Sequence, residues 1–144
     1  MVILEMEATD REDAASQLAQ RLFEKGLLQA VALDPYGVGA IVDALYEVGI
    51  YGQDIIVGIS QGWKLSGAIK TAERKLADRT LIHGGQALMA WAVSNARVEP
   101  KGNAIVITKQ ASGTAKIDPL MAALNAVAWM SANPTTNQPS IFFV

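Results

Sequence analysis

Two aspartate–proline pairs are the residues in this sequence best suited to hold a divalent cation. Asp34-Pro35 follows an apolar run, and Asp118-Pro119 opens an apolar segment with helical spacing. Carboxylate oxygens suit Mg²⁺ and Mn²⁺, and two-metal cleavage of phosphodiesters gathers acids from several elements. Each pair also fits an ordinary helix start, in which aspartate caps the helix and proline occupies its first turn. Both interpretations stay open at this point.

A serine in a glycine-rich turn is a second candidate. Residues 58–62 spell GISQG and match G-x-S-x-G, the turn that presents the nucleophile of α/β-hydrolases, with Ser60 in that position. Such chemistry also needs an acid and a base, and Asp78 and His83 are the candidates in the required order. They are only five residues apart at one helix end, which is a poor placement for a triad. We therefore favour a simple turn after a strand here, and a turn or core role for His83.

Several other chemistries are excluded by composition. The chain has no cysteine, so disulfides, thiolate nucleophiles and thiolate metal sites are ruled out, and its single histidine rules out a multi-histidine cage. The phosphate-binding motif G-x-x-x-x-G-K-[ST] does not occur. Gly37-Val38-Gly39 begins a dinucleotide fingerprint, but Val42 stands where the third glycine is needed.

The net charge of −2 hides an uneven distribution. Residues 1–54 hold ten acids and three bases, whereas residues 55–144 hold four acids and nine bases. Such an asymmetry is consistent with a surface that faces a polyanion, although it also fits two halves that neutralise each other. The candidates for phosphate contact are Lys70, Arg74, Lys109 and Lys116.

The apolar spacing predicts strands that alternate with helices. Strands are predicted over residues 2–6, 28–33, 54–59, 97–99, 104–107 and 141–144. Helices are predicted from a cap at Thr9 or Asp10 to Gly26, and over residues 38–48, 65–78, 86–95 and 119–130. Residues 100–103 form the predicted hairpin turn. The buried helix faces are predicted to hold Leu65, Ala68, Ile69, Ala72 and Leu76, and Leu120, Leu124, Val127 and Met130, and the three tryptophans are assigned to helix packing.

This order of elements predicts an α/β layer fold with helices on both faces of a sheet. Ligands in such folds sit beyond the carboxyl ends of the strands, which points to Asp34 and to Ser60 with Gln61. Hydrophobic residues make up 51% of the chain, and the longest apolar run, Ala87 to Val93, is too short for a membrane span. The acidic N-terminus does not resemble a secretory signal. We therefore expect a globular, cytoplasmic protein without a membrane partner.

The order and spacing of these motifs resemble the nuclease domain of the tailed-phage terminase large subunit over roughly residues 16 to 131. The resemblance begins with ALDPYG at residues 32–37, ISQG at 59–62 and LSGA at 65–68, followed by Lys70. It continues with LIHGG at 81–85, then Trp91, Asn95, Gly102-Asn103, Lys109, and KID at 116–118 opening an alanine-rich helix.

The resemblance implies a ribonuclease H-like mixed sheet and a metal-dependent endonuclease that cuts concatemeric double-stranded phage DNA during packaging. Three acids would hold a two-metal site of Mg²⁺ or Mn²⁺, with Asp34 as the second acid and Asp118 as the third. His83 is a possible auxiliary residue. The family's partners are the portal and the small terminase subunit, and its location is the cytoplasm of the bacterial host.

The first acid of the family lies on an opening strand that has no counterpart here; Glu5 and Glu7 are candidates only by position. We therefore expect residues 1–144 to be one partial nuclease domain, without its opening strands and without the ATPase motor domain. Two interpretations follow: a truncated nuclease, or a catalytically inactive remnant that acts as a DNA-binding or interaction module. An exposed edge at Val2 to Met6 further predicts a homo-oligomer of the isolated chain.

Overall fold

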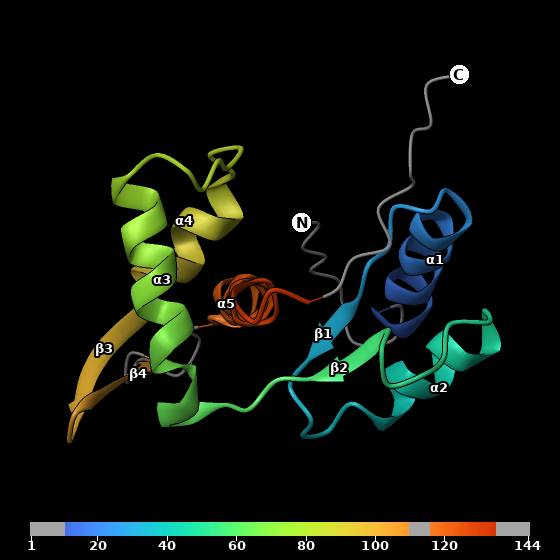
Figure 1. Cartoon of the computed structure of the whole chain (residues 1–144), viewed down its shortest axis with the longest axis horizontal. Coiled ribbons are helices and arrows are strands. Elements are labelled where there is room, and N and C mark those ends of the chain that lie inside the picture. Colours follow the sequence, from blue (N-terminus) through green and yellow to red (C-terminus); the bar gives the residue numbers. More distant parts are fainter. Residues whose placement is uncertain (1–10, 110–115, 135–144) are drawn as a thin grey trace.

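The computed structural model of the 144-residue chain describes residues 11–109 and 116–134. Five α-helices, one short 3₁₀ helix and four strands occupy these residues (Figure 1). In chain order they are α1 (Arg11–Glu24), β1 (Val31–Leu33), α2 (Gly39–Glu47), β2 (Ile56–Gly58), η1 (Gly62–Leu65), α3 (Ser66–Ala77), α4 (Ala87–Ser94), β3 (Ala96–Lys101), β4 (Ala104–Lys109) and α5 (Asp118–Ser131). The predicted terminal strands, 2–6 and 141–144, and the predicted cap at Thr9 or Asp10 lie outside the described residues.

β1 and β2 form a parallel pair, as the sequence predicts, but both strands are shorter than predicted. Val31 pairs with Ile56, and Leu33 pairs with Gly58. β1 starts late because the chain leaves α1 through Gly26 at φ +66°, and the amide of Leu28 still donates to the Leu22 carbonyl. β2 starts late because the amide of Ile56 donates to the Gly52 carbonyl in a turn.

β3 and β4 form the predicted antiparallel hairpin, but its turn is tighter than predicted. Lys101 pairs with Ala104, so the turn consists of Gly102 and Asn103 alone, with Gly102 at φ +61°. Pro100 pairs with Ile105 inside the ladder, and its assignment to the turn was wrong. Proline is tolerated there because β3 is an edge strand whose outer side needs no donor.

The four described strands form two separate sheets, one parallel and one antiparallel, whereas the sequence predicts one mixed sheet. The hairpin packs on η1 and α3, and the amide of Ile105 donates to Ser66 Oγ at 3.1 Å. An amide on β4 is therefore bonded to the start of a helix and not to a further strand. The described part is a mixed α/β structure, and the ribonuclease H-like arrangement stays a prediction.

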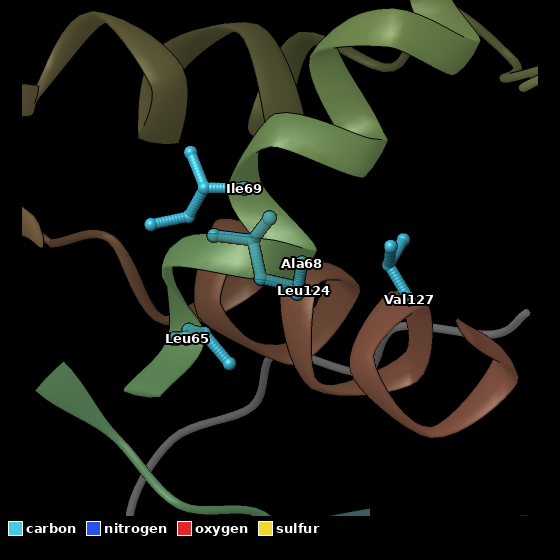
Figure 2. Packing of buried hydrophobic residues seen from close by; sticks show 5 residues of the cluster. All are labelled: Leu65, Ala68, Ile69, Leu124 and Val127. Carbon is cyan, nitrogen blue, oxygen red and sulfur yellow. The ribbon is translucent and has the colours of Figure 1, made fainter. Parts of the chain in front are cut away.

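Two apolar clusters form the core. One cluster joins η1, α3 and α5 through the buried side chains of Leu65, Ala68, Ile69, Leu124 and Val127 (Figure 2). The other joins α1 and α2 through Ala19, Leu45 and Ile50. α5 contacts β1 as well as η1, α3 and α4, and it lies between the two groups of elements in Figure 1. α5 therefore connects the parallel strands to the rest of the fold.

The predicted helix faces are correct except in their last turns. Leu76 is 48% exposed and Met130 is 60% exposed, because the α3–α5 cluster includes Ala72 and Ala128 but neither Leu76 nor Met130. The assignment to helix packing was also wrong for Trp63 and Trp91, whose side chains are exposed, whereas Trp129 is half-buried. No helix within residues 11–109 and 116–134 has the length and hydropathy that a bilayer crossing requires.

Candidate active site

Asp34 lies at the carboxyl end of β1, where the α/β rule places a ligand site. Its Oδ1 accepts a hydrogen bond from the Tyr36 amide at 3.1 Å, which forms a turn closed by the aspartate side chain. Helix α2 begins later, with Val38 at its N-cap and no side-chain cap. The capping interpretation of Asp34 is therefore wrong, and its half-buried carboxylate is oriented by the turn.

The end of β2 lies beside the Asp34 turn. The amide of Ile59 donates to the Leu33 carbonyl at 2.7 Å, which continues the parallel pairing past the last paired residues. A Cβ built on Gly58 would lie 3.7 Å from the Pro35 Cβ, so the two segments are in contact distance at this point. The turns after β1 and after β2 are thus neighbours, as their order in the sequence predicts.

Gln61 connects the end of β2 to α5. Its Nε2 donates both to the Ile59 carbonyl at 2.8 Å and to Asn125 Oδ1 at 2.9 Å. Asn125 is only 5% exposed, so this is a hydrogen bond between side chains in a largely dry environment. Gln61 was predicted at the sheet edge, whereas Asn125 was not among the predicted site residues. The signal in the sequence was a single asparagine, Asn125, within the otherwise apolar predicted helix 119–130.

Asp118 is the first residue of α5, and Pro119 follows it. Ile117 occupies the N-cap, and no side chain caps the helix, so the capping interpretation of Asp118 is wrong as well. The exposed carboxylate is compatible with the positive end of the helix dipole. Asp118 precedes Asn125 by seven residues, which places both on the same helix face, about 10 Å apart along the axis.

The segment that leads into α5 is anchored from α4. Asn95 ends α4, and its Nδ2 donates to the Lys116 carbonyl at 3.1 Å. Ile117 then packs in a buried position, while the Lys116 side chain is exposed. The start of α5, which carries Asp118, is therefore held by a backbone contact immediately before it.

The four predicted phosphate contacts are all exposed, and they come from three neighbouring parts of the fold. Lys70 and Arg74 lie on α3, Lys109 ends β4, and Lys116 precedes α5. α3 contacts both β4 and α5. Exposure and this arrangement are what a phosphate-binding role requires, although a shared orientation of the four side chains stays a prediction.

The His83 side chain forms a hydrogen bond within its own turn. Its Nδ1 accepts a hydrogen bond from the Gly85 amide at 3.2 Å, and the side chain is exposed. Asp78 occupies the C-cap of α3, and within the described part of the chain no hydrogen bond joins Ser60 to His83. The geometry gives no support to a serine hydrolase, and an auxiliary role of His83 stays a prediction.

The described acids do not complete a two-metal site. Among residues 11–109 and 116–134, no three acidic or histidine side chains are grouped so that they could hold a metal ion. Asp34 and Asp118 carry the hard oxygen atoms that divalent cations prefer, but a pair of ions needs more acids, and the binding of a metal by these two residues stays a prediction. The positional candidates Glu5 and Glu7 lie outside the described residues.

Comparison with known proteins agrees with this combination of motifs. A sequence model of the family described as terminase large subunit, endonuclease domain, matches residues 8–133. No curated protein and no solved structure matches the chain. The matched region contains Asp34, Gln61, Asp118 and Asn125, and it extends over almost the whole chain. The chain therefore belongs to the terminase large subunit endonuclease family.

Proposed function

We propose that this chain is a metal-dependent endonuclease domain that cuts concatemeric double-stranded phage DNA during packaging. The observation that carries the proposal is the link between Gln61 and Asn125, which ties α5 to the strand end beside Asp34. α5 starts with Asp118, so the helix that carries one candidate acid is hydrogen-bonded to the segment next to the other. We assign metal binding and catalysis to Asp34 and Asp118.

Different hydrogen bonds hold the segments that carry the two acids. The Tyr36 amide fixes one oxygen of Asp34, which leaves the carboxylate oriented at the end of β1. Asp118 is exposed at the first turn of α5, and the contact between Asn95 and the Lys116 carbonyl limits movement of that turn. A bound Mg²⁺ or Mn²⁺ would polarise the scissile phosphate and generate a hydroxide nucleophile. The protein holds the carboxylates and the DNA in a fixed position relative to each other.

DNA binding in this proposal depends on phosphate contacts. Lys70, Arg74, Lys109 and Lys116 would position the duplex without reading its bases, because lysine and arginine side chains pair with phosphate oxygens of any sequence. The portal and the small terminase subunit are the proposed protein partners, and the cytoplasm of the bacterial host is the proposed location. Self-association of the chain remains a prediction that light scattering tests.

The alternative is a DNA-binding module that does not cut. It is favoured by one observation: no group of three acidic or histidine side chains among the described residues could hold a metal ion. Both proposals place the same basic residues on DNA, so binding does not distinguish them. Cleavage does, because only the first proposal requires Asp34 and Asp118.

The test is conversion of supercoiled plasmid to nicked and linear forms by the full chain with Mn²⁺ present. We expect cleavage that falls at least 100-fold in Asp34→Asn and in Asp118→Asn. Asp43→Asn is the matched control, since Asp43 is an exposed acid on α2. A loss of cleavage in Glu5→Gln or Glu7→Gln would identify a third catalytic acid. DNA binding without any Mn²⁺-dependent cleavage by the unaltered chain would reject the nuclease in favour of the binding module.

A further inference from the structure

An exposed indole stands directly after the candidate site. Trp63 lies in η1, two residues after Gln61, and its side chain is 57% exposed. Neighbouring Leu65 is 2% exposed and packs toward α5, so Trp63 is on the outer side of the same short helix. The exposed ring of Trp63 offers an aromatic surface next to the candidate site.

Trp63 directly precedes an exposed side of α3. The exposed residues Gly67, Lys70 and Arg74 follow one another at spacings of three and four residues, which places them on one side of α3. Exposed Trp63 lies in η1, the turn that leads into this helix. The buried residues of the same segment, Leu65, Ala68 and Ile69, contact α5 on the opposite side (Figure 2). We call the four exposed residues the α3 outer face.

The α3 outer face is open and positively charged. A Cβ built on Gly67 would meet no atom within 4 Å, so nothing in the described fold covers the centre of this face. Residues 62–77 hold four bases, Lys64, Lys70, Arg74 and Lys75, against the single acid Glu73. Lys64 Nζ lies 5.9 Å from the centre of the Trp63 ring, within the range of a cation–π contact. An aromatic ring beside several cations suits a nucleic-acid strand better than an apolar protein partner.

We propose that Trp63 stacks on an unpaired nucleotide of the DNA while Lys70 and Arg74 contact the adjacent phosphates. The inference rests on the proposed function, in which these two cations already face DNA, and it adds which form of DNA the site prefers. Inside a duplex, neighbouring base pairs stack on each other and cover the base faces, so an indole stacks most readily where a base is unpaired. The α3 outer face therefore favours DNA that has a single-stranded end or gap next to the duplex.

The test compares three fluorescently labelled DNAs of equal length: a single strand, a duplex with a single-stranded overhang, and a blunt duplex. Trp63→Leu removes the aromatic ring but keeps an apolar side chain, and we expect it to weaken binding of the first two DNAs about 10-fold. Binding of the blunt duplex should change less than about 2-fold. Trp63→Phe should restore most of the lost affinity, because phenylalanine also stacks.

Trp91→Leu is the matched control, since Trp91 is the other exposed tryptophan and lies on α4. The single strand should quench tryptophan fluorescence of the unaltered chain and of Trp91→Leu, but much less that of Trp63→Leu. As a second variant, Gly67→Glu puts a negative charge into the open space of the α3 outer face, and we expect it to weaken binding of all three DNAs. Gly67→Ala should leave binding unchanged.

The outcomes separate this inference from the proposed function. If Trp63→Leu weakens binding of all three DNAs equally, or of none of them, the stacking inference is overturned. In that case, binding of the blunt duplex through Lys70 and Arg74 still supports the proposed function. Failure of the unaltered chain to bind any of the three DNAs at low salt overturns both.

Discussion

The side chains of Gln61 and Asn125 meet at 2.9 Å although they are 64 residues apart in the chain. Gln61 follows the strand pair that ends beside Asp34, and Asn125 lies two turns into the helix that starts with Asp118. This hydrogen bond is a direct polar connection between the two parts of the fold that carry the candidate acids. It joins the middle of α5 to the segment that follows β2, in addition to the direct packing of α5 on β1.

Removal of one partner of this pair is expected to destabilise the fold. Gln61→Leu leaves the Asn125 carbonyl oxygen without its donor in a position that is 5% exposed, which should cost about 1–3 kcal/mol of unfolding free energy. The double variant Gln61→Leu with Asn125→Leu should recover part of that loss, because no polar group is then left unpaired. Urea unfolding of the single and double variants measures both effects. Strictly additive losses would show that the two side chains do not interact.

The same variants should affect DNA cleavage beyond their effect on stability. A displacement of α5 by about 1 Å would move Asp118 relative to Asp34, and misplacement of that size can reduce a rate about 100-fold. We expect Gln61→Leu to cut plasmid at least 10-fold more slowly at a temperature where it remains folded. Wild-type cleavage by a folded Gln61→Leu protein would argue against a positioning role for this pair.

Ser66 should stabilise the hairpin specifically. Its Oγ accepts the amide of Ile105, so Ser66→Ala leaves a partly buried backbone donor on β4 without its acceptor. We expect a loss of about 1 kcal/mol in unfolding free energy and faster hydrogen exchange at the Ile105 amide. Ser60→Ala is the matched control, since Ser60 is exposed. Unchanged exchange at Ile105 in Ser66→Ala would contradict the contact.

Duplex binding should depend on salt through the predicted phosphate contacts. The slope of log affinity against log salt should decrease by about one unit for each of Lys70, Arg74, Lys109 and Lys116 that is replaced by alanine. Lys25→Ala, an exposed lysine in the acidic part of the chain, should leave the slope unchanged. Salt titrations by fluorescence anisotropy provide the slopes. A slope that is insensitive to all four substitutions would remove these residues from the DNA interface.

Local signals in the sequence predicted much of the fold. Gly26 and Gly49 end α1 and α2 at positive φ, and Gly102-Asn103 lies at the predicted hairpin. These features depend on single residues and their neighbours, so one sequence suffices to find them. The strand ends were less accurate, because turn hydrogen bonds such as that from Ile56 to Gly52 compete with the ladder.

Features that depend on distant contacts were harder to predict. Trp63 was assigned to packing on its residue type, but its exposure depends on which side of η1 faces α5. Asn125 was overlooked because its partner, Gln61, is remote in sequence. Asp34 and Asp118 were identified from their positions at element ends, and their metal-binding role stays a prediction. The separation of the strands into two sheets was not predicted either, and no local pattern reveals that the Ile105 amide on β4 donates to Ser66.

The most direct test of the proposed function is anomalous diffraction from crystals of the chain grown with Mn²⁺. We expect a manganese peak within about 2–2.5 Å of carboxylate oxygens from both Asp34 and Asp118, and loss of that peak in Asp34→Asn. Metal ions of a paired site lie only about 3.5–4 Å apart, so the two carboxylates must converge. A structure in which they are more than about 10 Å apart, with no manganese shared between them, would show that Asp34 and Asp118 do not form one metal site.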